Sequence, residues 1–181
     1  ELAVDGWDLS TASCSDGSPV NEIDVAAGET VTCTFTNTQR GQIVVDKVTD
    51  PSGSSQQFEF NPSWSDSNFF LTDAGGTHSS GWLTPGTGYS VAEVNVPAGW
   101  SNNSASCVSS FGDTETIGAI ELDAGEIVTC TFGNYLQRGH IIVDKVTNPS
   151  GSSQSFEFDP SWPGINFFLT EIGIKGPNWL S

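Results

Sequence analysis

Residues 41–72 read GQIVVDKVTDPSGSSQQFEFNPSWSDSNFFLT, and this stretch decides the fold because it returns almost unchanged later in the chain. Residues 139–170 read GHIIVDKVTNPSGSSQSFEFDPSWPGINFFLT. The offset between the two copies is constant: for their lysines, 145 − 47 = 98. A fixed period of this size is typical of an array of similar modules, each about the size of an immunoglobulin domain.

The remainder of the repeat also returns, but at the other end of the chain. Residues 7–14 match residues 100–107. The sequence VTCTF occurs at residues 31–35 and again at residues 128–132. The chain is therefore expected to hold three parts: the C-terminal half of a repeat (1–40), a complete repeat (41–138) and the N-terminal half of a repeat (139–181).

Strand patterns dominate the chain, and no window of about 11 residues has a helical period. In residues 30–37, for example, Val31, Cys33 and Phe35 share one face while threonines occupy the other. With about seven or eight such strands per copy, the pattern predicts an all-β chain of tandem immunoglobulin-like antiparallel β-sandwich modules. Residues 89–94 are expected to form one strand, and residues 74–80 a loop. The expected core of the complete copy contains Ile43, Val45, Phe58, Phe60, Val91, Val128 and Phe132.

Composition narrows the classes of partner. The chain has 22 acidic and 5 basic residues and a net charge of −17, which disfavours nucleic acid and anionic membranes because both require Lys and Arg. No run of about 18 apolar residues predicts a membrane span. The polar, lightly charged surface is typical of secreted β-proteins. Because Glu1 begins inside a strand pattern, we expect the sequence to be processed or to be part of a longer one.

Four cysteines occur as two per copy, Cys14 with Cys33 and Cys107 with Cys130. An even count at repeated positions in a secreted-looking chain predicts disulfides within each pair. Free thiols in the core are the alternative. The closely spaced sets of ligands that zinc requires are absent, so no metal site and no cofactor are expected.

Three motifs of the complete copy carry a resemblance to a known family. They are a first strand with one lysine (VVDKV, 44–48), a YSVAE strand followed by a PAGW corner (89–93 and 97–100), and a last strand ending FGN (132–134). In this order they resemble the prealbumin-like, collagen-adhesin B-type repeats of bacterial surface proteins and pilins. The resemblance implies an extracellular stalk or pilus, often locked by an isopeptide bond between Lys and Asn.

Lys47, Glu93 and Asn134 are the expected members of that cross-link. Face alternation places Lys47 with Ile43 and Val45, Glu93 with Tyr89 and Val91, and Asn134 with the Val/Cys/Phe face of its strand. A buried, neutral lysine is a nucleophile, the Asn carboxamide is an acyl donor, and a protonated carboxylic acid can move the proton. The alternatives are a buried Lys–Glu ion pair with an Asn hydrogen bond, or a lysine whose tip reaches the surface.

The two partial copies contain complementary pieces of the same set. Residues 139–181 hold Lys145, whereas residues 1–40 hold Asn37 and Glu1, the counterparts of Asn134 and Glu93. We expect one subunit's N-terminal half to complete its neighbour's C-terminal half, head to tail, with Lys145 facing Asn37 and Glu1. The alternative is one continuous repeat chain, which the missing counterpart of residues 84–92 favours.

The sequence thus predicts an extracellular or cell-surface structural protein that associates with itself and is not an enzyme. The rival hypothesis is an adhesin that binds a glycan or a host protein. It rests on tryptophans that recur by copy: Trp64, Trp82 and Trp100 with Trp162, Trp179 and Trp7. Neither histidine has a recognisable catalytic partner, and no acidic loop has the spacing of a calcium-binding loop.

Overall fold

The computed structural model describes residues 1–161, 164–171 and 175–179, the last of these for their backbone only. Trp162 and the side chain of Trp179 therefore lie outside the described residues. The chain forms two compact units, Glu1–Tyr135 and Leu136–Ser181. Among the described residues, no helix is long and apolar enough to cross a membrane.

The first unit begins with an antiparallel hairpin of two strands, β1 (Trp7–Cys14) and β2 (Cys33–Gln39). The register pairs Cys14 with Cys33 at one end of the hairpin and Trp7 with Gln39 at the other. At the second end, the Arg40 guanidinium donates to both oxygens of Asp8, at 2.6 and 2.8 Å. The chain then passes directly into the next strand.

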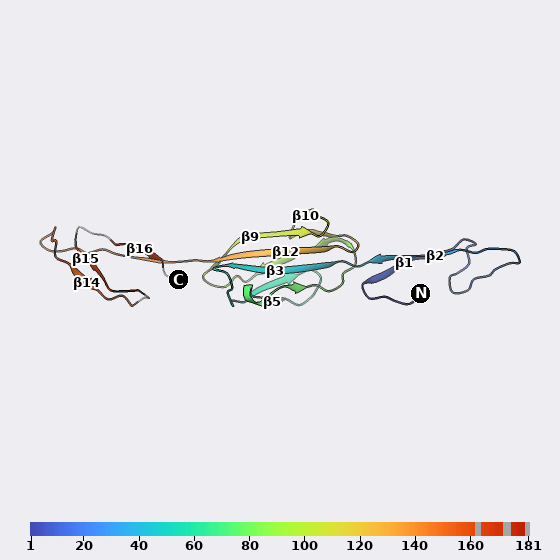
Figure 1. Ribbon diagram of the computed structural model, residues 1–181, viewed down its shortest axis with the longest axis horizontal. Coiled ribbons are helices and arrows are strands. Elements are labelled where there is room, and N and C mark those ends of the chain that lie inside the picture. The colour runs from blue at the N-terminus through green and yellow to red at the C-terminus, as the bar shows by residue number, and fades with distance from the viewer. Residues whose placement is uncertain (162–163, 172–174, 180–181) are drawn as a thin grey trace. The chain divides into compact units, whose positions relative to one another are not determined.

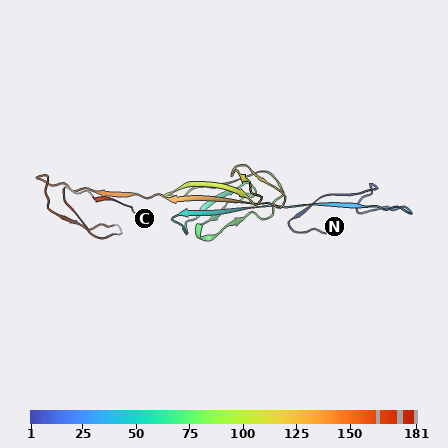
Figure 2. The same ribbon diagram turned by 45° about the horizontal axis from the view of Figure 1, so that its top comes forward.

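The rest of the first unit is a β-sandwich, seen from two directions in Figures 1 and 2. One layer is a five-stranded sheet in the order β10-β9-β12-β3-β6, and the other contains a three-stranded sheet in the order β5-β4-β8. A further pair, β11 and β7, closes the sandwich. The bounds are β3 (Gln42–Asp50), β4 (Phe58–Pro62), β5 (Phe69–Leu71), β6 (His78–Ser79), β7 (Gly86–Tyr89), β8 (Val91–Val94), β9 (Trp100–Ser109), β10 (Thr114–Glu115), β11 (Ile120–Leu122) and β12 (Ile127–Leu136). One short 3-10 helix, η1, spans Asp73–Gly75.

β3 and β12 lie side by side and parallel, in register from Gln42 with Ile127 to Asp50 with Tyr135 (Figure 1). The pairings β4–β5, β4–β8 and β3–β6 are antiparallel, as the sequence predicts. The first and last strands of the module are the exception. Because these two strands are parallel, the chain enters the sandwich at one end and leaves it at the other, about 30 Å away for strands of nine residues.

The core follows the predicted alternation. All seven predicted core residues are buried in one cluster, which also contains Leu71, Cys107, Ile120, Leu122 and Cys130. On β3, the buried positions alternate from Ile43 to Thr49, so Lys47 enters the core with its apolar neighbours. The antiparallel sandwich predicted for this part of the chain is confirmed, with its single parallel pair as an addition.

Two local predictions were wrong. Residues 89–94 do not form one strand: β7 pairs with β11, β8 pairs with β4, and the chain changes partner at Ser90. Ser90 bonds to Ser63 through both its N–H and its C=O, which fixes this step between strands. Residues 74–80 are not simply a loop, because β6 pairs with β3 and the His78 ring stacks on Phe69 at 3.8 Å.

The second unit repeats the pairings of the module's first half. Its strands are β13 (His140–Val143), β14 (Phe156–Phe158), β15 (Phe167–Leu169) and β16 (Lys175–Trp179). β14 pairs with β15 with the register that β4 and β5 have, since Phe156 faces Leu169 as Phe58 faces Leu71. β13 pairs with β16 in the manner of β3 with β6.

Candidate functional site

Lys47 is a buried ammonium group on β3, 1% exposed, and it has three hydrogen-bond acceptors. Its Nζ donates to the carbonyl oxygens of Val48 at 2.8 Å and Phe132 at 3.0 Å, and to Oδ1 of Asn134 at 2.7 Å. Nζ also lies 4.2 Å from the centroid of the Phe58 ring. These contacts fix the nitrogen between β3 and β12, against the side-chain carbonyl of Asn134.

Glu93 approaches the same nitrogen from the opposite layer. The Lys47 Nζ–Glu93 Oε1 distance is 3.8 Å, and both side chains are at least 98% buried. Within the described residues, neither carboxyl oxygen of Glu93 is matched with a hydrogen-bond donor. A buried carboxylate in this position is costly, because its solvation by water is lost and only the nearby lysine compensates.

Burial shifts both groups toward their neutral forms. It raises the pKa of the Glu93 carboxyl above its ordinary 4.5, while the Asn134 amide and the Lys47 ammonium act in the opposite direction. It also lowers the pKa of the Lys47 ammonium from its ordinary 10.5, with Glu93 opposing the shift. A neutral amine is a nucleophile and a neutral carboxylic acid is a proton donor, so both pKa shifts favour the forms that amide exchange would use.

Asn102 is a member of the site that the sequence did not reveal. The Asn134 Nδ2 group donates to Asn102 Oδ1 at 2.7 Å, which directs the Asn134 carbonyl oxygen toward Lys47. Asn102 lies on β9, next to β12 in the sheet. Its counterpart in the N-terminal hairpin is Leu9, so the comparison of copies gave no signal for it.

The two other parts of the chain hold pieces of this arrangement. In the second unit, Lys145 Nζ donates to the carbonyl of Val146 and lies 4.3 Å from the Phe156 ring, as Lys47 does with Val48 and Phe58. In the N-terminal hairpin, Asn37 Nδ2 donates to Glu1 Oε1 at 2.7 Å. Lys145 belongs to the second unit and Asn37 to the first, so a bond between them stays a prediction.

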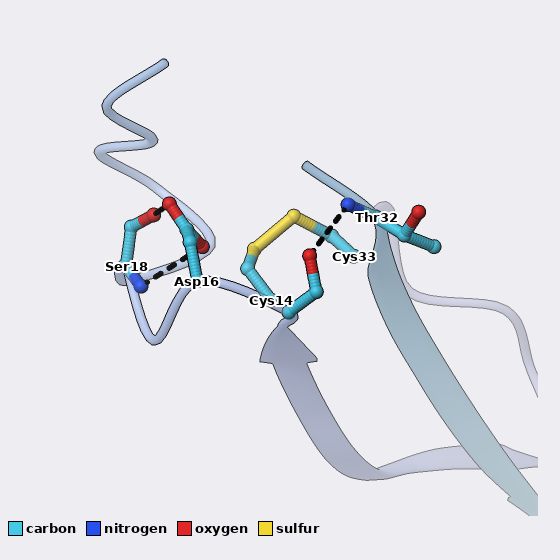
Figure 3. Close-up of a disulfide and its surroundings, with 6 residues drawn as sticks. Cys14, Asp16, Ser18, Thr32 and Cys33 are labelled. Carbon is cyan, nitrogen blue, oxygen red and sulfur yellow. Dashed lines mark hydrogen bonds between the residues drawn. A yellow bond between two sulfur atoms is a disulfide. The ribbon is translucent and has the colours of Figure 1, made fainter. Parts of the chain in front are cut away.

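Two disulfides join the cysteine pairs, Cys14 with Cys33 and Cys107 with Cys130. Figure 3 shows the first disulfide at the end of the hairpin. There the Ser15 N–H donates to the carbonyl oxygen of Thr32 at 2.8 Å, and the Thr32 N–H donates to the Ser15 hydroxyl oxygen at 3.0 Å. The second disulfide, Cys107–Cys130, lies in the core between β9 and β12. It therefore ties together the two strands that carry Asn102 and Asn134.

One acidic cluster lies outside this site. Carboxyl oxygens of Asp113, Glu115 and Glu126 come within 4.8 Å of one another. The buried Glu126, however, accepts a hydrogen bond from the backbone N–H of Asp123 at 2.6 Å. Glu29 does the same for Ala26 in the hairpin, at 2.8 Å, so this glutamate position has a turn-forming role in both copies.

The fold makes this chain a β-sandwich protein, with the side chains of Lys47, Glu93 and Asn134 buried in the sandwich. A family model identifies the particular family: residues 43–136 match the prealbumin-like fold domain. It spans over half of the chain, and the chain belongs to this family. Among curated proteins, no sequence match is found.

Comparison with solved structures finds proteins of two bacteria. The major pilin of Streptococcus pyogenes is 16% identical with a TM-score of 0.42, over 75% of this chain and 66% of the pilin. The Bacillus anthracis TIE protein is 17% identical with a TM-score of 0.46, over 83% of this chain and 30% of that protein. The chain thus spans less than two thirds of either relative.

Proposed function

We propose that this chain is a structural subunit of an extracellular filament, pilus or cell-surface stalk, built from prealbumin-like modules in series. The observation that carries the proposal is a difference in burial between equivalent residues. Several apolar side chains that form the core of the complete module are exposed at the matching positions of the two partial copies, although Leu169, the counterpart of Leu71, stays buried. In this proposal each partial copy is part of a module that the matching part of another copy completes.

Three pairs of residues give the size of this difference. Ile43 is 0% exposed and its counterpart Ile141 is 43% exposed. Phe58 is 0% exposed and Phe156 is 37% exposed, while Phe132 is 3% exposed and Phe35 is 40% exposed. Burying one large apolar side chain contributes about 1.5–3 kcal/mol, so joining the halves has a large driving force.

The direction of assembly follows from the parallel pair β3 and β12. The chain enters the module at one end and leaves it at the opposite end. After Tyr135 it reaches β13 within a few residues. A head-to-tail contact between such units does not close on itself and generates a filament. Completion of one unit's exposed strands by another's is a recurring mode of strand addition.

Within each complete module, we propose an isopeptide bond between Lys47 and Asn134. The neutral Lys47 amine attacks Cγ of Asn134, the Cγ–Nδ2 bond breaks, and ammonia leaves. Glu93 takes the proton released by Nζ and delivers it to the departing nitrogen, so it acts as the catalytic acid and base. The 2.7 Å contact between Lys47 Nζ and Asn134 Oδ1, and burial of all three groups, support this reaction.

The filament could form in two ways, and both use the same joint. In one, separate subunits complement each other; in the other, one continuous repeat chain runs through the filament.

The adhesin alternative rests on the tryptophans, yet Trp64 and Trp100 pack against the core. The exposed Trp82 ring lies against Gly6, where a β-carbon would be 3.0 Å from the ring, so it packs at the junction between hairpin and sandwich.

Self-assembly of the purified chain tests the proposal. We expect filaments by electron microscopy, with no added ligand. Phe156→Ser should abolish them, whereas Phe168→Ser should not, because Phe168 and its counterpart Phe70 are both exposed, at 61% and 56%. A monodisperse monomer at all concentrations would contradict the filament. In native filaments, a denaturing gel distinguishes subunits from one very large continuous chain.

A further inference from the structure

We propose that Asn102 orients the leaving nitrogen in the reaction between Lys47 and Asn134 and directs the released ammonia toward solvent. The inference rests on the isopeptide bond proposed above, and it concerns a side chain outside the lysine, asparagine and acid that carry out that reaction. The leaving atom is Asn134 Nδ2, which donates to Asn102 Oδ1 at 2.7 Å.

The orientation of the Asn134 amide follows from the chemistry of its two neighbours. Lys47 Nζ can only donate a hydrogen bond, so the amide oxygen must face it, at 2.7 Å. The amide nitrogen then points elsewhere and needs an acceptor, which Asn102 supplies. With both ends of the amide held, the nitrogen that leaves lies on the side of Asn102 and not on the side of the attacking amine.

An irregularity in β9 brings the Asn102 side chain to this position. Cys107 points into the core, and strict alternation from it would turn Asn102 outward. A β-carbon on Gly133 of β12 would collide with both Asn103 Oδ1 and Ser104 Oγ, so two consecutive residues of β9 lie over one residue of β12. Two residues opposite one is the arrangement of a β-bulge, which re-aims a neighbouring side chain.

The N-terminal hairpin has the same irregularity with a different residue at the decisive position. Its register shifts between Leu9 and Thr11, which leaves Ser10 as the extra residue. Leu9 is the counterpart of Asn102 and has no side-chain atom that could accept an N–H. The irregular backbone therefore belongs to both copies, whereas the acceptor for the leaving nitrogen belongs to the complete module.

Asn102 also gives the leaving group a way out of the core. The side chains of Lys47, Glu93 and Asn134 are buried, whereas Asn102 is exposed. In the reaction, Nζ bonds to Cγ, the Cγ–Nδ2 bond breaks, and the proton lost by Nζ passes through the Glu93 carboxyl to Nδ2, which leaves as ammonia. Ammonia released on the side of Asn102 reaches solvent and is diluted, so its return to attack the new amide is disfavoured.

The rate of bond formation in the full chain tests this role. The chain is made by cell-free synthesis and sampled over time, and the peptide that joins residues 47 and 134 is quantified by digestion and mass spectrometry. Asn102→Leu has a branched side chain without an acceptor, and it should slow bond formation roughly 10- to 100-fold, because small misplacements of reacting groups have effects of this order. Asn102→Asp keeps an acceptor oxygen and should restore a rate close to that of the parent chain.

Asn103→Ser is the matched control, because it too installs the residue of the hairpin copy, one position further along β9. Its rate should equal that of the parent chain. Since Asn102 is exposed, its substitution should leave the fold intact, which circular dichroism checks. Asn102→Ala is a second variant with the same expected slowing.

The outcomes separate this inference from the proposed bond. Bond formation at the parent rate in Asn102→Leu would overturn the role of Asn102 and leave the bond standing. An Asn102→Asp chain as slow as Asn102→Leu would also overturn it, because packing and not the acceptor would then set the rate. If the parent chain never forms the linked peptide, both the inference and the proposed bond are wrong.

Discussion

Lys47 and Asn134 lie on the first and last strands of the complete module, and their side chains meet at 2.7 Å between Nζ and Oδ1. β3 and β12 are parallel and adjacent, so tension on the two ends of the module loads their backbone hydrogen bonds in shear. A covalent bond at this contact would carry the load directly from β3 to β12. The chain between the two bonded residues, 48–133, would then not extend under tension.

The first prediction concerns the mass of the complete module. The reduced, unassembled chain should be one ammonia lighter than its sequence requires. Glu93→Gln should restore the full mass, because the proton transfer is lost while the shape of the side chain is kept. Glu121→Gln, an exposed acid on β11, is the control and should keep the deficit. Full mass in the starting chain would leave a buried ion pair in place of the bond.

The second prediction concerns pH and uses Asn134→Ala, which removes the acyl donor. The Glu93 pKa is raised by burial, so just above 4.5 the folded state holds a proton that the unfolded state has released. The free energy of unfolding should therefore fall as pH rises through this window. The lowered Lys47 pKa has the opposite sign: just below 10.5 the unfolded state holds the extra proton, and stability should rise with pH.

Urea unfolding at a series of pH values measures both slopes. Adding Glu93→Gln to Asn134→Ala should flatten the acidic slope and leave the alkaline one. If the acidic slope is unchanged, the group that titrates there is not Glu93.

The third prediction concerns the buried disulfide. Cys107 and Cys130 are 23 residues apart, and closing a loop of this length stabilises the folded state by about 3 kcal/mol in the chain-entropy model. The double variant Cys107→Ala, Cys130→Ala should lose about that much in urea unfolding. Thiol titration of the denatured parent chain should find no free cysteine. Four reactive thiols would show that the pairs are not formed in solution.

Sequence alone was sufficient for the features that depend on alternation within one strand. The Ile43–Val45–Lys47 face of β3 is buried as predicted, because side chains two residues apart must share a face. Alternation also predicted that Lys47, Glu93 and Asn134 point inward, whereas their grouping in one site came from the resemblance to the family. The repeat located Lys145 and Asn37 at matching positions.

Features that depend on pairing between strands could not be predicted in this way. Alternation does not reveal which strand lies beside which, so the parallel pair β3–β12 and the change of partner at Ser90 were missed. β6 was read as a loop because two residues are too few for a period. Asn102 was missed because its contribution arises only from the neighbouring position of β9 and β12.

The last prediction uses two glycines that occupy the same place in two copies. A β-carbon on Gly41 would lie 2.8 Å from Cγ of Leu122 and 2.9 Å from the backbone oxygen of Glu126, so the complete module has no room for it. A β-carbon on Gly139 would meet nothing within 4 Å. Docking in the same register would bring Gly139 against Val25 and Glu29 of the next unit, the counterparts of Leu122 and Glu126.

Gly139→Ala should therefore leave the melting temperature of the isolated subunit unchanged and still reduce filament formation strongly. Gly41→Ala should lower the melting temperature, because the strain falls within the complete module of every chain. Gly118→Ala, with open space around the new methyl group, is the control for both measurements. Light scattering follows assembly and calorimetry follows melting. Filaments of Gly139→Ala that form at the normal rate would mean that the joint between units does not reproduce the packing of the complete module.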